Sequence, residues 1–152
     1  MAEKTKEKVY EKYAWIAFLV LGAIFLVGAV PHALGSNTDP ALVKEISGMT
    51  PGDLKDSNPM FFDLYSYYFM GGGLSDIGFA FLITVISMTA YRRGEKWAWY
   101  AFWFVPAYFL GWVALGLTIE SSSSTIPYLM VFVILSLVGL LLPFRKFFPS
   151  KA

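Results

Sequence analysis

Six side chains that can bind a ligand or exchange a proton lie in or near strongly apolar segments of this sequence. They are His32, Asp63, Asp76, Glu120, Tyr67 and Trp112. Carboxylates and an imidazole can bind a cation, transfer protons, or hydrogen-bond a quinone or a lipid headgroup. Tyrosine and tryptophan can line such a site, because each joins an apolar ring to one polar group. Asp76 is the strongest candidate, since an ionisable residue inside a membrane segment is costly and usually functional.

These residues also have structural interpretations, which the sequence leaves open. Asp76 follows the glycine triplet Gly71-Gly72-Gly73 and is a residue type that caps helix N-termini, where a carboxylate interacts well with the helix dipole. His32 lies near the predicted end of an apolar segment, and Glu120 lies at the end of another. The structural interpretations account for the positions of these side chains with fewer assumptions than a binding site does.

The composition argues against catalysis and metal binding. The chain has one histidine and no cysteine, so it lacks thiolate ligands and the two or three imidazoles usual in zinc, copper or non-haem iron sites. It also contains no GxSxG, P-loop, GxGxxG or HExxH motif. We therefore predict no catalytic residues, no metal and no cofactor.

Apolar segments must position the candidate residues. Hydrophobic residues make up 57% of the 152-residue chain, whereas soluble domains have roughly 45–50%. Four segments approach the ~20 residues that cross the hydrocarbon of a bilayer. They lie at about 14–33, 72–91, 97–119 and 126–144. The sequence predicts an all-α polytopic membrane protein, a single domain (1–152) folded as a bundle of four transmembrane helices.

The basic residues predict an orientation for this bundle. Of the 12 Lys and Arg, ten lie before the first span, between the second and third, or after the fourth. Only Lys44 and Lys55 lie in the first connection. Because cytoplasmic flanks retain positive charge, both termini should be cytoplasmic in a multi-pass cell-membrane protein, and the loop 34–71 should face outward. The four ionisable candidates then all belong to the outer half.

The outward loop carries its own helix signals. Asp39-Pro40, Thr50-Pro51 and Asn58-Pro59 each place a capping residue before a proline, the usual start of a helix. A helix running from Pro59 to Arg92 would be ~50 Å long at ~1.5 Å per residue, against ~30 Å of hydrocarbon. We therefore predict a bend, break or re-entrant element at the hinge Gly71, Gly72, Gly73. A straight helix that projects beyond the bilayer is the alternative.

Small residues and a proline predict how the helices pack. Helices in lipid associate through small side chains, because lipid supplies no hydrophobic drive between them. Three faces carry such residues: Gly71, Ser75 and Gly78; Ala107, Gly111 and Ala114; and Ser136 with Gly139. They would serve close packing inside the bundle or against a partner. Pro106 predicts a kink in the third span.

The junction between the second and third spans carries a resemblance. Its sequence is Arg92-Arg93-Gly94-Glu95-Lys96-Trp97-Ala98-Trp99. It resembles the tight cytoplasmic turn of small four-helix integral membrane proteins of the DoxX-like type, over the second and third spans. The resemblance carries no catalytic residue. It implies an accessory or quinone-linked subunit of a membrane oxidoreductase.

These observations favour a non-catalytic integral membrane protein, an accessory or scaffold subunit of a larger membrane complex such as an oxidoreductase. Its expected partners are the lipid bilayer and other membrane subunits or further copies of itself. Nucleic acid is not expected, because the basic residues lie beside the spans instead of forming one basic face. The alternative function is a binder or carrier of a small molecule, lipid, quinone or ion, using an outward-facing pocket around Asp76.

Overall fold

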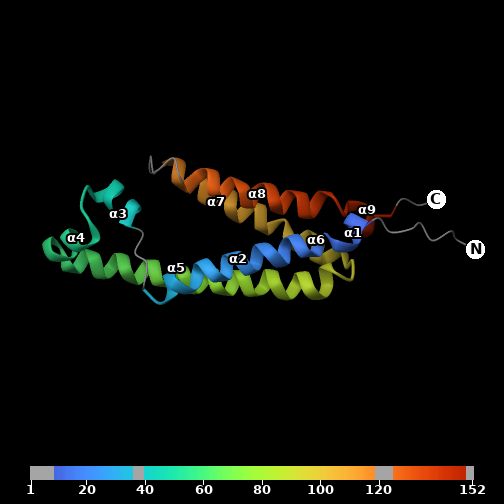
Figure 1. Cartoon of the computed structure of the whole chain (residues 1–152), viewed down its shortest axis with the longest axis horizontal. Helices are drawn as coiled ribbons and strands as arrows, with labels where there is room; N and C mark the ends of the chain where they lie inside the picture. The colour runs from blue at the N-terminus through green and yellow to red at the C-terminus, as the bar shows by residue number, and fades with distance from the viewer. Residues whose placement is uncertain (1–8, 36–39, 119–124, 150–152) are drawn as a thin grey trace, which may run out of the picture.

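The molecule is elongated and helical, as Figure 1 shows. The computed structural model describes residues in three ranges, 9–35, 40–118 and 125–149. Within those ranges every regular element is a helix, which confirms the all-α prediction. The short helices α1 (Val9–Tyr13) and α9 (Phe144–Phe147) lie at one end, called here the basal end. The short helices α3 (Pro40–Ser47) and α4 (Pro51–Ser57) lie at the other, the distal end.

Four helical segments run between these ends. They are α2 (Trp15–Ala33), α5 (Pro59–Ile86) continued by the π-helix η1 (Ser87–Tyr91), α6 (Lys96–Phe102) with α7 (Phe104–Thr118), and α8 (Thr125–Leu141). Within the described ranges, three stretches are long and apolar enough to cross a membrane, namely Val9–Ala33, Pro59–Tyr91 and Lys96–Thr118. A shorter apolar helix, Ile126–Leu141, accompanies them. The helices therefore fit a membrane-embedded protein, while the fourth crossing and the orientation stay predictions.

The predicted helix starts in the distal region are confirmed. The hydroxyl of Thr50 accepts a hydrogen bond from the Asp53 backbone N–H at 3.2 Å, and the Asp53 carboxylate accepts one from the Thr50 N–H at 3.3 Å. This reciprocal cap begins α4. It also lowers the pKa of Asp53, first through the Thr50 hydroxyl and then through its backbone N–H. Asn58 caps α5 by accepting from the Phe61 N–H at 3.2 Å. Asp39 lies outside the described residues.

The predicted break at the glycine triplet is wrong. Helix α5 is unbroken from Pro59 to Ile86 and continues past the end of α2 toward the distal end (Figure 1). The reason is a tertiary contact that local sequence does not show. A Cβ at Gly73 would lie 2.8 Å from the carbonyl carbon of His32, whereas Gly71 and Gly72 have nothing within 4 Å. Gly73 thus lets α2 and α5 approach closely, and the unbroken helix keeps its own backbone groups hydrogen-bonded.

The long helices pack as two pairs that diverge toward the distal end (Figure 1). Helix α2 lies along α5, α7 lies along α8, and α2 contacts α8. Glycines mark two of these contacts: a Cβ at Gly22 would lie 3.2 Å from the Ala80 carbonyl oxygen, and one at Gly139 would lie 2.8 Å from the Phe18 ring. The backbones of α5 and α7 make little direct contact. Aromatic rings fill the space between them, for example Phe79 against Tyr108 at 4.4 Å between centroids.

At the basal end, buried side chains form hydrogen bonds between helices. The buried Tyr91 hydroxyl donates to the Gly139 carbonyl at 2.6 Å, and the Trp99 indole N–H donates to the Leu140 carbonyl at 3.0 Å. Tyr91 ends the π-helix η1, whose wider hydrogen-bond spacing the sequence did not predict. These bonds tie η1 and α6 to α8.

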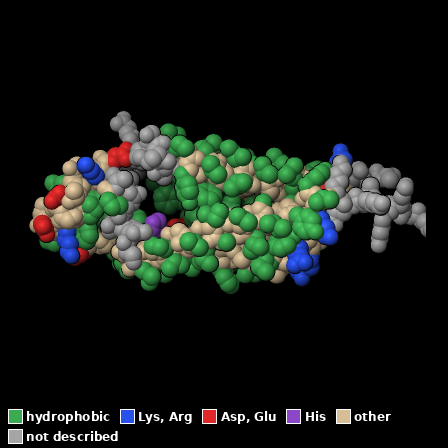
Figure 2. Space-filling model, viewed as in Figure 1, with side chains coloured by type: hydrophobic (Ala, Val, Ile, Leu, Met, Phe, Trp, Pro, Cys, Tyr) green, Lys and Arg blue, Asp and Glu red, His purple; other side chains and the backbone are tan. Residues whose placement is uncertain are grey.

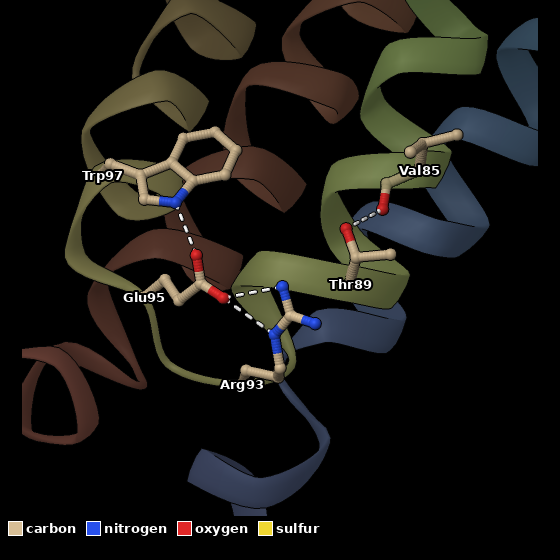
Figure 3. A network of polar contacts seen from close by, with 5 residues as sticks. All are labelled: Val85, Thr89, Arg93, Glu95 and Trp97. Atoms are coloured by element: carbon tan, nitrogen blue, oxygen red, sulfur yellow. Dashed lines mark hydrogen bonds and ion pairs between the residues drawn. The ribbon is translucent and has the colours of Figure 1, made fainter.

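The turn from η1 to α6 is closed by its own side chains, as Figure 3 shows. The Glu95 carboxylate accepts from the Trp97 indole at 2.6 Å and from the Arg93 guanidinium at 2.7 Å. These two contacts, with Trp97 the larger, lower the pKa of Glu95. Gly94 adopts a φ of +77°, which favours glycine. On the preceding helix, Thr89 donates to the Val85 carbonyl at 2.6 Å.

The third segment is interrupted where proline chemistry requires it. Pro106 lacks an N–H and its ring crowds the carbonyl four residues earlier, at Phe102. Helix α6 accordingly ends at Phe102, and α7 begins at Phe104. Pro106 lies in the first turn of α7. The helix is therefore interrupted at Trp103, about one turn before the proline.

Candidate functional site

Asp76 forms a hydrogen bond between two of the long helices. The Tyr108 hydroxyl on α7 donates to the Asp76 Oδ1 on α5 at 2.5 Å, and both side chains are half-buried. Asp76 lies well inside α5, so it caps no helix end, and the capping interpretation is wrong. The bond bridges the two helices whose backbones stay apart. A carboxylate inside an apolar helix therefore has a donor, as buried polar groups require.

His32 lies close to this pair. It occupies the last turn of α2, its ring lies 4.7 Å from that of Phe69, and it interacts electrostatically with Asp76. Figure 2 shows the purple histidine beside a red acidic side chain, at the edge of a hollow between the diverging helix pairs. The structure thus brings together an imidazole and a carboxylate that are 44 positions apart in the sequence.

Trp112 belongs to the same region, one turn of α7 beyond Tyr108. The two rings meet edge-on, with centroids 6.4 Å apart and an interplanar angle of 73°. Trp112 remains exposed on the surface of α7. Two of the sequence candidates, Asp76 and Trp112, therefore contact Tyr108, and a third, His32, interacts electrostatically with Asp76.

The other three candidates do not join this group in the described part of the chain. Asp63 and Tyr67 lie on the part of α5 that extends past α2, and both are exposed. Asp63 precedes Asp76 by 13 residues, or ~20 Å along a helix. Glu120 lies outside the described residues. Among the residues that the structure describes, no group of three His, Cys, Asp or Glu side chains is arranged to hold a metal ion.

Tyr108 is the site residue that the sequence reasoning missed. No spacing along the chain links α5 to α7, so the pairing could not be found from periodicity. One signal was available: a carboxylate in an apolar span needs a donor. The third span offers tyrosine hydroxyls only at Tyr100 and Tyr108, of which Tyr108 lies farther from the basal turn.

A shallow groove runs along α7 beside this pair. Its volume is about 340 Å³, and it is lined by Phe104, Ala107, Tyr108, Gly111, Trp112 and Leu115. The groove exists because Ala107 and Gly111 are small while the residues flanking them are large. Nothing lies within 4 Å of a Cβ placed at Gly111. The groove is apolar, and Tyr108, whose hydroxyl bonds Asp76, is one of its lining residues.

Comparisons with protein-family models, curated proteins and solved structures gave no match. The resemblance of the basal turn to DoxX-like proteins therefore stays a prediction. Chemically, the site offers one carboxylate, one imidazole, one phenol and one indole beside an apolar groove. Such a set can bind a ligand through charge, hydrogen bonds and ring faces.

Proposed function

We propose that the protein is a non-catalytic subunit of a membrane complex, a bundle of four transmembrane helices that binds another membrane protein through α5. The supporting observation is an exposed stripe along this helix. It comprises Met60, Leu64, Tyr67, Gly71, Ser75, Gly78, Leu82 and Val85. Successive members are three or four residues apart, so they share one face of the helix. This face is turned away from α2, against which Gly73 packs.

The middle of the stripe suits close helix packing. Gly71 and Gly78 have nothing within 4 Å of an added Cβ, and Ser75 lies between them. In lipid, small residues spaced in this way let two helix backbones approach closely. Only the third predicted small-residue face, Ser136 with Gly139, is buried inside the described fold. The α5 face is therefore available to a partner.

The stripe continues beyond the part of α5 that packs on α2. From Pro59 to Tyr68 the helix projects by ~14 Å at ~1.5 Å per residue. Met60 is 82% and Tyr67 is 73% exposed on this projection. A contiguous apolar face outside the bilayer marks an interaction site. A membrane subunit with both a transmembrane helix and an outer segment fits this face, and the DoxX-like resemblance is consistent with such a role.

Substitution of the stripe glycines tests this function. In mild detergent the wild-type chain should purify with a stoichiometric membrane-protein partner or as a homo-oligomer. Gly71→Leu and Gly78→Leu should abolish that association. Gly28→Leu is the matched control, because Gly28 is an exposed α2 glycine that also has nothing within 4 Å. A wild-type chain that is monomeric and alone, or equal association in all three variants, would contradict the proposal.

We propose a second function, favoured by the Asp76 geometry: binding of a small amphiphile, lipid, quinone or ion at the groove of α7. Asp76 caps no helix end, and its partner Tyr108 lines the groove. The predicted orientation places this site in the outer half of the membrane. Mass spectrometry of small molecules that co-purify with the wild type, and are absent from Gly111→Leu, would support this function. Identical co-purifying molecules in both would argue against it.

A further inference from the structure

The two ends of the molecule carry charge of opposite sign. In the described chain, the basal elements α1, the turn 92–95, α6 and α9 hold six cations against two carboxylates, a formal charge of +4. These residues are Lys12, Arg92, Arg93, Lys96, Arg145 and Lys146 against Glu11 and Glu95. The described distal elements α3, α4 and the projecting part of α5 hold two cations against four carboxylates, a formal charge of −2. These are Lys44 and Lys55 against Glu45, Asp53, Asp56 and Asp63. Figure 2 shows blue side chains gathered at the basal end.

The two basal carboxylates leave most of the positive charge uncompensated. Glu95 pairs with Arg93 at 2.7 Å, and Glu11 is buried with 8% of its surface exposed. Three exposed cations instead lie over aromatic rings. Measured to the ring centroid, Lys12 lies 5.3 Å from Tyr13, Arg92 lies 5.0 Å from Trp15, and Lys96 lies 5.5 Å from Phe148. A ring face attracts a cation without cancelling its net charge.

Exposed aromatic side chains mark the level of these cations in a bilayer. Trp97, Tyr100 and Trp103 are 53%, 61% and 38% exposed. Tryptophan and tyrosine collect where the hydrocarbon meets the headgroups. Lys96 comes directly before these rings, and α7, which follows them, contains no charged residue. The basal cations therefore lie on the headgroup side of the aromatic belt, at the level of lipid phosphates.

The distribution of the cations favours a lipid leaflet over a single macromolecular partner. The cations come from four separate elements, and Arg92 and Lys96 contact rings in different segments, Trp15 in α2 and Phe148 after α9. A protein or a nucleic acid contacts one face, whereas the lipids of a leaflet surround the whole bundle. Lysine and arginine next to a membrane attract anionic headgroups within a Debye length of ~10 Å. The predicted orientation places the basal end at the cytoplasmic leaflet, which contains anionic lipids.

We infer that the basal end binds anionic phospholipids of the adjacent leaflet, with their phosphate groups against Arg92, Lys96 and the neighbouring cations. The distal end, where carboxylates outnumber cations, has no such preference. This inference goes beyond both proposed functions. It requires the helices to cross a bilayer, but it needs neither a partner at the α5 stripe nor a ligand in the α7 groove.

Lipids with brominated acyl chains test the inference, because bromine quenches tryptophan fluorescence at short range. Four of the five tryptophans, Trp15, Trp97, Trp99 and Trp103, lie near the basal end. The full chain is reconstituted in bilayers of phosphatidylglycerol and phosphatidylcholine with identical chains, and each lipid is brominated in turn. The anionic lipid should bind about fivefold more tightly or better, the preference that one basic residue near an anionic surface supplies. High salt should reduce this preference.

Lys96→Gln and Lys55→Gln form a matched pair of variants. Each lysine is exposed and lies over a phenylalanine ring, Lys55 at 5.9 Å from the centroid of Phe62. Lys96→Gln should lower the preference for the anionic lipid by about twofold or more, and adding Arg92→Gln should lower it further. Lys55→Gln, at the distal end, should leave the preference unchanged.

Three outcomes would overturn the inference. The first is equal quenching of the wild type by both brominated lipids. The second is an equal loss of preference in Lys96→Gln and Lys55→Gln. The third is competition by an excess of inorganic phosphate at constant ionic strength, which would indicate a site for a free anion instead of a lipid.

Discussion

The adjacent glycines Gly72 and Gly73 should respond oppositely to the same substitution. An alanine at Gly72 meets nothing within 4 Å, so it should stabilise the protein by up to about 1 kcal/mol through helix propensity. An alanine at Gly73 places its Cβ 2.8 Å from the His32 carbonyl carbon and 2.9 Å from the Ala33 Cα. Because these are backbone atoms, they cannot move aside without shifting α2.

The magnitude follows from comparing the two variants. Carbon atoms are optimally spaced at roughly 3.5–4.0 Å, so both contacts of the added Cβ are repulsive. Overpacking of this kind costs about 1–3 kcal/mol. Since alanine gains the same helix propensity at both positions, that contribution cancels in the comparison. Gly73→Ala should therefore be less stable than Gly72→Ala by about 1–3 kcal/mol.

The assay is thermal and denaturant unfolding of both variants and the wild type in the same detergent, followed by circular dichroism. Gly71→Ala serves as a second control, because it also has open space around its Cβ. Equal stability of Gly72→Ala and Gly73→Ala would refute the close approach of α2 and α5 as the reason for the glycine. Equal destabilisation of all three variants would instead indicate that the triplet acts as a hinge.

Three further predictions concern single hydrogen bonds. In a double-mutant cycle on unfolding free energy, Asp76→Ala and Tyr108→Phe should be coupled by about 0.6–2 kcal/mol, and independent effects would show that the bond across the helices is not formed. Tyr91→Phe should destabilise the protein by about 0.5–1.5 kcal/mol, measured by thermal unfolding, because its hydroxyl bonds a backbone carbonyl at 2.6 Å. Carboxyl NMR should show a Glu95 pKa below 4.5, the ordinary value for glutamate, and Trp97→Phe should raise that pKa, since the indole is its main hydrogen-bond donor. The stabilisation from this contact should be present above pH 4.5 and lost as the pH falls through the lowered pKa, and an unchanged pKa in Trp97→Phe would contradict the assignment.

Local chemistry made much of the fold predictable. The capping residues Thr50 and Asn58 determine the helix starts through hydrogen bonds to residues three positions away, which the sequence shows directly. Long apolar runs likewise predict the long helices. Pro106 predicted the position of the interruption in the third segment to within one turn, because a proline disturbs the carbonyl four residues before it.

Contacts between distant segments account for what the sequence did not reveal. The triplet at 71–73 indicated a break because glycine is a poor helix former, but whether a glycine serves flexibility or close approach depends on the neighbouring helix. The candidate site was found in part for the same reason. The sequence singled out Asp76 and His32 as ionisable residues in apolar surroundings, whereas their link to Tyr108 depends on how α5 and α7 face each other.

The unbroken course of α5 has a mechanical consequence. Because α5 is one continuous helix, a movement of the projecting part with Met60 and Tyr67 would be passed on to the part that carries Asp76. A partner bound to the distal part of α5 would apply a torque along the whole helix. That torque would reach the bond from Tyr108 to Asp76 and then the π-helix η1, where the backbone hydrogen bonds already have a different spacing. An event at the distal end would thus register near the basal end without any movement of ligand or charge between them.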